Sequence, residues 1–135
     1  MAERNQSPKI LVVLDDLIFS SKIREAAKPL SIDLEFIKSP NGLSHKIKSE
    51  QPSLLIFDLN FKSCNPLQII KDLKSSPELK DIPILGYLSH VQTELKEEAV
   101  KAGCDLVLPR SRFSRELREI LMRYSNQRQA SSTEI

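Results

Sequence analysis

Short apolar runs alternate along this chain with segments whose apolar residues recur at helical spacing. Each run is only a few residues long, which is typical of strands buried in a parallel sheet. The predicted strands cover residues 10–14, 33–38, 54–58, 82–88 and 106–108. In the second run charged and apolar residues alternate, which favours an edge strand whose charges discourage pairing with other chains.

Between and after these runs, apolar residues recur every three or four positions, which predicts five helices. These positions are Ile23, Ala26, Ala27 and Leu30; Leu43 and Ile47; Leu67, Ile70 and Leu73; Val91, Leu95, Ala99 and Ala102; and Phe113, Leu117, Ile120, Leu121 and Tyr124. Ser20 or Ser21 can cap the first helix, and Pro29 should end it or disturb its last turn. Pro66 can open the third helix, and Gly103 can end the fourth.

This alternation of strands and helices, with short connections, predicts an α/β fold built on one parallel sheet. Because right-handed crossovers join parallel strands, helices should cover both faces of the sheet. The chain has 135 residues, the usual size of one domain. We expect that domain to span residues 9–124, with the polar segments 1–8 and 125–135 as flexible tails.

Composition narrows the class of protein. Hydrophobic residues at 40% and charged residues at 28% are ordinary for a soluble globular protein, and a net charge of +2 indicates no strong commitment to nucleic acid or membranes. The apolar run at 10–14 is too short for a signal-peptide core or a membrane span, so we expect a cytoplasmic protein without membrane contact. Cys64 and Cys104 lack metal-type spacing and are expected to be reduced thiols.

The carboxyl ends of parallel strands meet at one edge of a sheet, and ligands bind there. This edge should receive Asp15, Asp16, Asp58, Leu88, Ser89 and Arg110. Three carboxylates would repel one another unless a cation lies among them or some are protonated. Oxygen ligands of this kind favour Mg²⁺, with water or a phosphoryl oxygen filling the other positions. The guanidinium of Arg110 could supply the positive charge in place of the metal or beside it.

Across residues 9–124 the sequence resembles the receiver domains of two-component response regulators. The matching segments are Val12-Val13-Leu14-Asp15-Asp16, Leu55-Ile56-Phe57-Asp58-Leu59-Asn60, Ile82-Pro83-Ile84 and Ala102-Gly103-Cys104-Asp105. The resemblance implies a three-layer, flavodoxin-like fold, with a five-stranded parallel sheet in the order 2-1-3-4-5. It also implies that Asp58 is the phospho-acceptor position, loaded by a histidine kinase with Mg²⁺ held by Asp15, or by Asp15 and Asp16, together with Asp58.

Two departures from that family's pattern concern the acids. Leu14 falls where the first acid usually stands, so an ungapped count leaves only Asp15 on a metal position. Losing one acid would weaken magnesium binding. Lys62 replaces a proline, and its cation could pair with Asp58 and hold it unphosphorylated.

Two further departures concern contacts to the phosphoryl group. Leu88 falls on the switch Thr/Ser position, with Ser89 one step late, and leucine cannot hydrogen-bond a phosphoryl group. Arg110 stands on the lysine position, where its larger, planar guanidinium is not an equivalent replacement. Together the departures indicate a degenerate receiver, or pseudo-receiver, in which Mg²⁺ binds weakly or not at all and phosphorylation is impaired or lost.

Each candidate also has a plainer structural interpretation. Asp15 and Asp16 could simply cap the first helix, and Ser89 could cap the fourth. The C-terminal arginines are interleaved with Glu116 and Glu119, which favours a solvated helix face over a nucleic-acid surface. An independent enzyme is not expected, because the chain lacks an Asp-x-Asp pair and a glycine-rich phosphate loop.

We therefore interpret the sequence as a stand-alone signalling module of a bacterial phosphorelay, without catalytic residues of its own. Its partner would be a sensor histidine kinase or another signalling protein. The resemblance places its output, and a homodimer contact, on the face of helix four, strand five and helix five. Candidate output residues are Leu106, Phe113, Arg115, Arg118 and Tyr124. The alternative is an adaptor on the same fold that binds protein or nucleic acid without phosphorylation.

Overall fold

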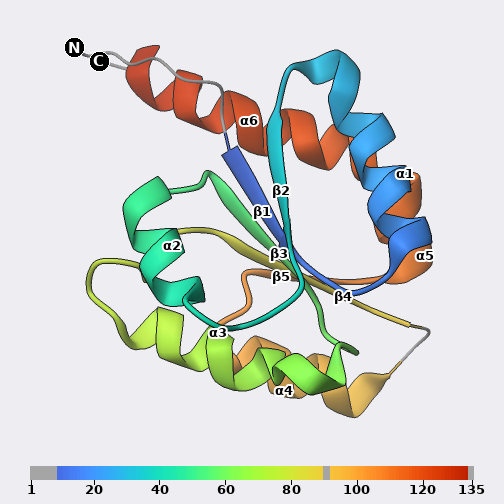
Figure 1. Ribbon diagram of the computed structural model, residues 1–135, viewed down its shortest axis with the longest axis vertical. Coiled ribbons are helices and arrows are strands. Elements are labelled where there is room, and N and C mark those ends of the chain that lie inside the picture. The colour runs from blue at the N-terminus through green and yellow to red at the C-terminus, as the bar shows by residue number, and fades with distance from the viewer. Residues whose placement is uncertain (1–8, 90–91, 134–135) are drawn as a thin grey trace.

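The computed structural model describes the backbone of residues 9–89 and 92–133 (Figure 1). It describes side chains over the same ranges except those of Lys62 and residues 126–133. The strands are β1 (Lys9–Val13), β2 (Asp33–Ile37), β3 (Leu54–Asp58), β4 (Ile84–Leu88) and β5 (Leu106–Pro109). They form one parallel five-stranded sheet in the order β2-β1-β3-β4-β5, which confirms the predicted fold and the edge position of the second strand.

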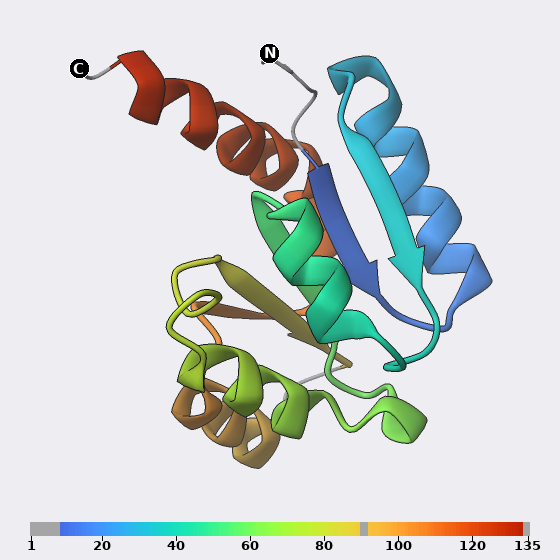
Figure 2. The ribbon, with the colours of Figure 1, turned by 60° about the vertical axis from the view of Figure 1, so that its left-hand side comes forward.

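The helices form the two outer layers. They are α1 (Leu17–Ala27), α2 (Leu43–Glu50), α3 (Pro66–Ser75), α4 (Thr93–Ala102), α5 (Arg110–Arg115) and α6 (Leu117–Thr133), with short 3₁₀ turns at η1 (Lys28–Leu30) and η2 (Lys62–Cys64). Figures 1 and 2 show α1, α5 and α6 on one face of the sheet and α2, α3 and α4 on the other. No helix in the described ranges is both long and apolar enough to cross a membrane.

Two hydrophobic cores lie between these layers, one on each face of the sheet. Along β1, Leu11 and Val13 pack into the core under α2, α3 and α4, while Ile10 and Val12 pack into the core under α1, α5 and α6. A strand buried on both faces needs apolar residues at every position, not at every second one. This is why β1 after Lys9 and β3 before Asp58 are continuous apolar runs in the sequence.

The start of α1 differs from the predicted one. The helix begins at Leu17, and the Oδ1 atom of Asp16 accepts a hydrogen bond of 3.0 Å from the backbone N–H of Phe19. The predicted cap at Ser20 or Ser21 is therefore wrong, and Ser20 is instead buried in the first turns of the helix. The alternative that an acid caps this helix is confirmed for Asp16.

Other helix ends follow the predictions. The helix α1 stops at Ala27, and the chain tightens into η1 at Pro29. Pro66 is the first residue of α3. Gly103 ends α4 with φ +117°, a backbone conformation that side chains with a Cβ rarely adopt.

The C-terminal helix is broken in two and is longer than predicted. At Glu116 the backbone leaves the helical conformation, with φ −102° and ψ 11°, which separates α5 from α6. The backbone then stays helical to Thr133, past residue 124 where the sequence predicts that ordered structure ends. Figures 1 and 2 show that the C-terminal part of α6 projects beyond the sheet. The predicted N-terminal tail, residues 1–8, lies outside the described residues.

Candidate functional site

The carboxyl edge of the sheet brings together three charged residues from distant parts of the chain. Asp58 is the last residue of β3, Asp16 precedes α1 just after β1, and Arg110 is the first residue of α5 directly after β5. β1 and β3 are adjacent and parallel, so the segments that follow them leave the sheet side by side. The strand order of the sheet therefore brings these distant segments to the same edge.

Arg110 is held in place by two contacts. Its Nη2 atom donates to the Oδ2 atom of Asp16, and its guanidinium carbon lies 4.5 Å from the centre of the Phe19 ring. Since Oδ1 of Asp16 caps α1, both oxygens of this carboxylate are engaged. The backbone N–H of Phe19, which caps the helix, is the main influence and lowers the pKa of Asp16 below its ordinary value. Burial opposes it, and the hydrogen bond and charge of Arg110 add to the lowering. Asp16 is thus a fixed anion paired with a fixed cation.

Asp58 is half-buried and is hydrogen-bonded within its own loop. Its Oδ1 atom accepts a bond of 2.9 Å from the backbone N–H of Asn60. Burial is the main influence on this group and raises the pKa of Asp58, and the negative charge of Asp16 acts in the same direction. The Asn60 N–H and the positive charge of Arg110 oppose the rise. Asp58 therefore lies within electrostatic reach of both members of the ion pair.

Asn60 connects the loops that surround Asp58. Its Oδ1 atom accepts hydrogen bonds from the backbone N–H of Ser89 at 2.8 Å and from the Ser89 hydroxyl at 3.1 Å. Its side-chain amide donates to Oε1 of Gln92 at 3.1 Å. Sequence reasoning did not assign a role to Asn60, although an amide two residues after the candidate acceptor was a usable signal. The role of Ser89 as a cap of α4 is wrong, because Gln92 occupies the N-cap position.

Comparisons with known proteins agree with this architecture. No protein-family model matches the chain. A curated relative, the response regulator Rcp1 of Synechocystis sp., is 26% identical over 95 residues, which cover 63% of this chain. The chain spans 65% of the length of that relative, which is less than two thirds.

Solved structures give a closer match in shape. A response regulator from Hahella chejuensis superposes with a TM-score of 0.79 at 19% identity and covers 87% of this chain and 95% of its own. A CheY-like receiver domain protein from Methanospirillum hungatei gives 0.76 at 15% identity, with 93% and 99% covered. This chain has the fold of a response-regulator receiver domain. The receiver domain of a sensor histidine kinase from Pseudomonas aeruginosa, which holds a magnesium ion in its active-site cleft, also gives 0.76 at 15% identity, with 90% and 99% covered.

In this receiver fold the predicted magnesium ligands are not gathered into one group. The side chain of Asp15 is exposed, whereas Asp16 is bound to Arg110. Within the described ranges, no three His, Cys, Asp or Glu side chains are grouped so that they could hold a metal ion. Asp58 could supply a carboxylate oxygen as it stands, whereas Asp16 could supply Oδ2 only if Arg110 left it. As arranged, the cap of α1 and Arg110 engage both oxygens of the Asp16 carboxylate, and the magnesium site stays a prediction.

The other predicted contacts to a phosphoryl group fall into different places. Leu88 is only 2% exposed and belongs to the core on the α2, α3 and α4 side. Ser89 is exposed and lies with Arg110 on the wall of a groove between α1 and α5 that also includes Ile18 and Ser114. The side chain of Lys62, the predicted blocking cation, lies outside the described residues. In the described structure the cation that acts on Asp58 is Arg110.

The predicted output face is only partly on the surface. Arg115 and Arg118 are exposed, and Leu106 and Tyr124 are half-buried. Phe113 is 0% exposed, so its assignment to the output face is wrong. Helical periodicity marked Phe113 as apolar, and the structure places it in the core under α1, α5 and α6.

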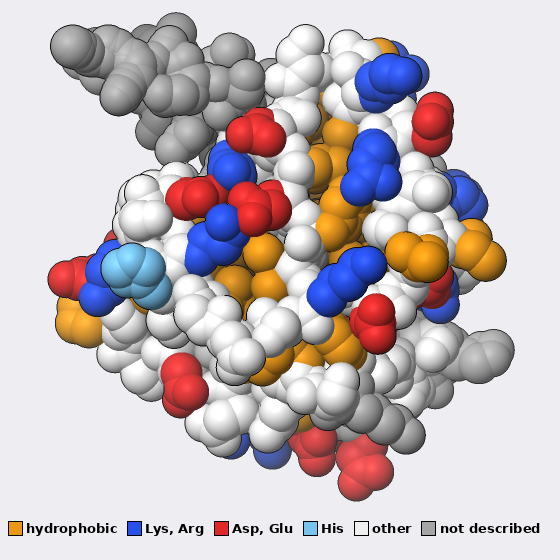
Figure 3. All heavy atoms as spheres, viewed as in Figure 1, with side chains coloured by type: hydrophobic (Ala, Val, Ile, Leu, Met, Phe, Trp, Pro, Cys, Tyr) orange, Lys and Arg blue, Asp and Glu red, His pale blue; other side chains and the backbone are white. Residues whose placement is uncertain are grey.

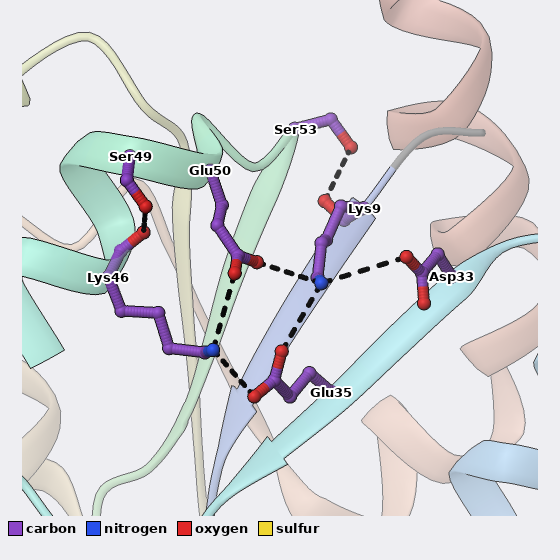
Figure 4. A network of polar contacts seen from close by, with 7 residues as sticks. All are labelled: Lys9, Asp33, Glu35, Lys46, Ser49, Glu50 and Ser53. Carbon is purple, nitrogen blue, oxygen red and sulfur yellow. Dashed lines mark hydrogen bonds and ion pairs between the residues drawn. The ribbon is translucent and has the colours of Figure 1, made fainter. Parts of the chain in front are cut away.

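A second charged cluster lies at the opposite end of β1. The Nζ atom of Lys9 contacts Glu50 at 2.8 Å, Glu35 at 3.2 Å and Asp33 at 3.6 Å, and Lys46 contacts Glu35 at 2.7 Å and Glu50 at 3.3 Å (Figure 4). Figure 3 shows these opposite charges alternating over β1, β2 and α2. Every charge in the cluster has a partner of opposite sign. The cluster therefore ties α2 to the sheet edge and offers no unpaired group to a ligand.

The two cysteines are buried free thiols, as the sequence predicts. Cys64, which follows the Asp58 loop, is 3% exposed, and burial raises the pKa of its thiol. A buried thiol with a raised pKa is a poor nucleophile. Cys64 is therefore a core residue and not a reactive group of the site.

Proposed function

We propose that this chain is a receiver-type signalling module in which Asp58 is the phospho-acceptor and a sensor histidine kinase is the phosphoryl donor. The proposal rests on one observation: the half-buried carboxylate of Asp58, at the end of the central strand β3, lies within electrostatic reach of the Arg110 guanidinium, which follows β5 at the same edge of the sheet and is held by Asp16. The similarity of this chain to the response regulator Rcp1 supports this function.

The transfer needs one free carboxylate oxygen. Oδ1 of Asp58 accepts the Asn60 N–H, so Oδ2 is the oxygen available for attack. A bond would form between Oδ2 and phosphorus as the bond from phosphorus to the donor's imidazole nitrogen breaks, and that nitrogen keeps the electron pair. Arg110 would offset part of the added negative charge, since a guanidinium suits phosphoryl oxygens.

The same geometry argues that phosphorylation is impaired. Arg110 is bound to Asp16, so a phosphoryl group must compete for it. Leu88 is buried and offers no hydrogen bond. We therefore expect Asp58 to be loaded more slowly than in a receiver whose cation is free. The paired Arg110 equally favours the second candidate, an adaptor that binds its partner through protein contacts without phosphorylation.

Mass spectrometry of the intact protein separates these two functions. Acetyl phosphate with Mg²⁺ should add one phosphoryl mass to the wild type and none to Asp58→Asn. Asp81→Asn, which alters an exposed aspartate, is the matched control and should be labelled like the wild type. An unmodified wild type, under conditions that label an ordinary receiver, would refute the phospho-acceptor role and leave the adaptor.

We propose that output passes through the face formed by α4, β5 and the predicted fifth helix, which the structure divides into α5 and α6. Arg115 of α5 and Arg118 of α6 are exposed. A pocket beside β5 is lined by apolar Leu88, Val107 and Leu108 and by Lys96 of α4. The same face could join two copies of the chain. Sedimentation of the wild type and Arg118→Glu at several concentrations tests the dimer, because a charge reversal at the contact should shift the equilibrium toward monomer.

Nucleic acid is the less favoured partner. Arg112 is paired with Glu116 at 2.9 Å, so part of the C-terminal positive charge is already neutralised. Binding that rests on phosphate contacts falls steeply with salt. We expect no retention of duplex or single-stranded probes at low salt, and salt-sensitive binding that weakens on replacing Arg115 and Arg118 would contradict this.

A further inference from the structure

Tyr87 is the largest side chain buried beside the candidate site. It lies on β4, is 1% exposed, and its ring is stacked on Phe113 with centroids 5.0 Å apart and an interplanar angle of 10°. The ring of Phe19 lies 5.1 Å away, tilted by 56°. Residues of α1 and α5 thus hold the Tyr87 ring from two sides, which fixes the direction of its hydroxyl group.

The hydroxyl group of Tyr87 has no hydrogen-bond partner within the described structure. Its oxygen is buried and makes no hydrogen bond to any described residue. A buried polar atom without a partner costs stability, and such atoms are rare in native proteins. Phenylalanine would fill the same space between Phe19 and Phe113 without that cost. The hydroxyl is therefore free to bond to a group that does not belong to the described chain.

The position of Tyr87 identifies where that partner would be. In the parallel pairing of β3 with β4, Tyr87 is the register partner of Asp58, so both side chains leave the sheet on the same face. Burial first, and then the carboxylates of Asp58 and Asp16, raise the pKa of Tyr87, while Arg110 opposes the rise. Those charges reach the phenol, which stays protonated and can donate a hydrogen bond at any physiological pH.

We propose that the Tyr87 hydroxyl is a hydrogen-bond donor to a tetrahedral oxyanion that enters between Asp58 and Arg110. The oxyanion is either the phosphoryl group carried by Asp58 or a free phosphate beside it. In the first case the inference rests on the function proposed above, and in the second it does not. A hydrogen bond from Tyr87 would couple the occupant of the site to the aromatic ring of Phe113, and so to α5.

Tyrosine substitutions test this with a built-in control. The chain has two tyrosines and no tryptophan, so Tyr124→Phe leaves Tyr87 as the sole tyrosine chromophore. Beryllium fluoride serves as a phosphoryl mimic that needs a carboxylate, and inorganic phosphate as the free anion. Calorimetry gives the affinity of the wild type, Tyr87→Phe and Tyr124→Phe for each probe. Near-ultraviolet absorption of Tyr124→Phe reports whether the Tyr87 hydroxyl gains a partner.

Beryllium fluoride should perturb the absorption of Tyr87 in Tyr124→Phe, and Tyr87→Phe should bind it roughly ten- to a hundredfold more weakly, the effect of one hydrogen bond to a charged acceptor. Adding Asp58→Asn should abolish the response to beryllium fluoride. A response to phosphate that survives Asp58→Asn would show that the free anion is the partner. Tyr87→Phe loses only an unpartnered oxygen, so it should fold at least as stably as the wild type.

The outcomes keep the two proposals apart. Labelling of Asp58 by acetyl phosphate, with equal affinities of Tyr87→Phe and the wild type for both probes, would overturn the role of Tyr87 alone. A Tyr87 response to phosphate, with no labelling of Asp58, would overturn the phospho-acceptor function alone. No labelling and no response to either probe would overturn both.

Discussion

Replacing Arg110 by glutamine tests whether this residue is the cation that holds the site together. The substitution removes the bond to Oδ2 of Asp16 and the contact with the Phe19 ring, and it leaves Asp16 and Asp58 as like charges without a counter-ion. It also removes the positive charge that lowers the pKa of Asp58, so that pKa should rise further. Both effects follow from one side chain that joins α1 to α5.

The expected loss of stability is modest because the pair is partly solvated. The side chains of Arg110 and Asp16 are 41% and 31% exposed, so the ion pair contributes about 0.5–1 kcal/mol after solvent screening. The cation–π contact with Phe19 contributes about 0.5–1 kcal/mol more. A total of about 1–2 kcal/mol should lower the melting temperature by about 4–8 °C in a domain of this size. Arg110→Lys keeps the charge but loses the planar stacking, so it should lose about half as much.

Thermal and urea unfolding, followed by circular dichroism, measure these differences. Arg123→Gln is the matched control, because it removes an exposed arginine of α6 and should change stability by less than about 0.5 kcal/mol. Equal melting temperatures for Arg110→Gln and Arg123→Gln would refute the reasoning. Calorimetric titration gives a second readout: Arg110→Gln should bind Mg²⁺ more tightly than the wild type, since Oδ2 of Asp16 becomes free.

Three further predictions concern stability. Burial raises the pKa of Asp58, so the ionised carboxylate lowers the free energy of unfolding at neutral pH. In urea unfolding, Asp58→Asn should therefore be more stable than the wild type at neutral pH. This difference should vanish as the pH falls to the ordinary pKa of an aspartate, where the wild-type carboxyl is protonated in the folded state. Lys9→Gln should lose about 1 kcal/mol, less at high salt. The pKa values of its partners Glu35 and Glu50 are lowered, so the loss should disappear once the pH falls below those pKa values and both glutamates are protonated. Gly103→Ala should cost about 1–2 kcal/mol more than Gly42→Ala: both have positive φ, but a Cβ at 103 would lie 2.5 Å from Cγ of Lys74, and one at 42 meets open space.

The strands were the most predictable part of the fold. The predicted bounds 54–58 agree with those of β3, because an apolar run buried on both faces is visible in a single sequence. Helix starts were less predictable, as α1 shows. Asp16, Ser20 and Ser21 could each cap it, and the choice of Asp16 goes with an ion pair to Arg110, which is 94 residues away. A local pattern cannot contain that information.

The site was predictable in its position but not in its contacts. The rule that parallel strands end at one edge placed Asp58, Asp16 and Arg110 together, and the structure does bring them together. Tyr87 escaped notice because, in the sequence, it belongs to an apolar run and looks like an ordinary core residue. Its unpartnered hydroxyl shows only when burial and hydrogen bonds are known. Phe113 was misplaced for the related reason that periodicity identifies an apolar face without saying what covers it.

Phosphorylation of Asp58 would place two anionic groups in competition for the Arg110 guanidinium: the Asp16 carboxylate and the phosphoryl group. The bond of Arg110 to Asp16 is worth about 1 kcal/mol or less, and a phosphoryl group on Asp58 would carry close to two negative charges against one on Asp16. The stronger anion should draw the guanidinium away from Asp16 and off the Phe19 ring. Because Arg110 is the first residue of α5, such a movement would begin at a helix of the proposed output face. An Asp58→Glu variant, which lengthens the carboxylate without adding charge, should leave Arg110 on Asp16, and its partner binding should match that of the unphosphorylated wild type.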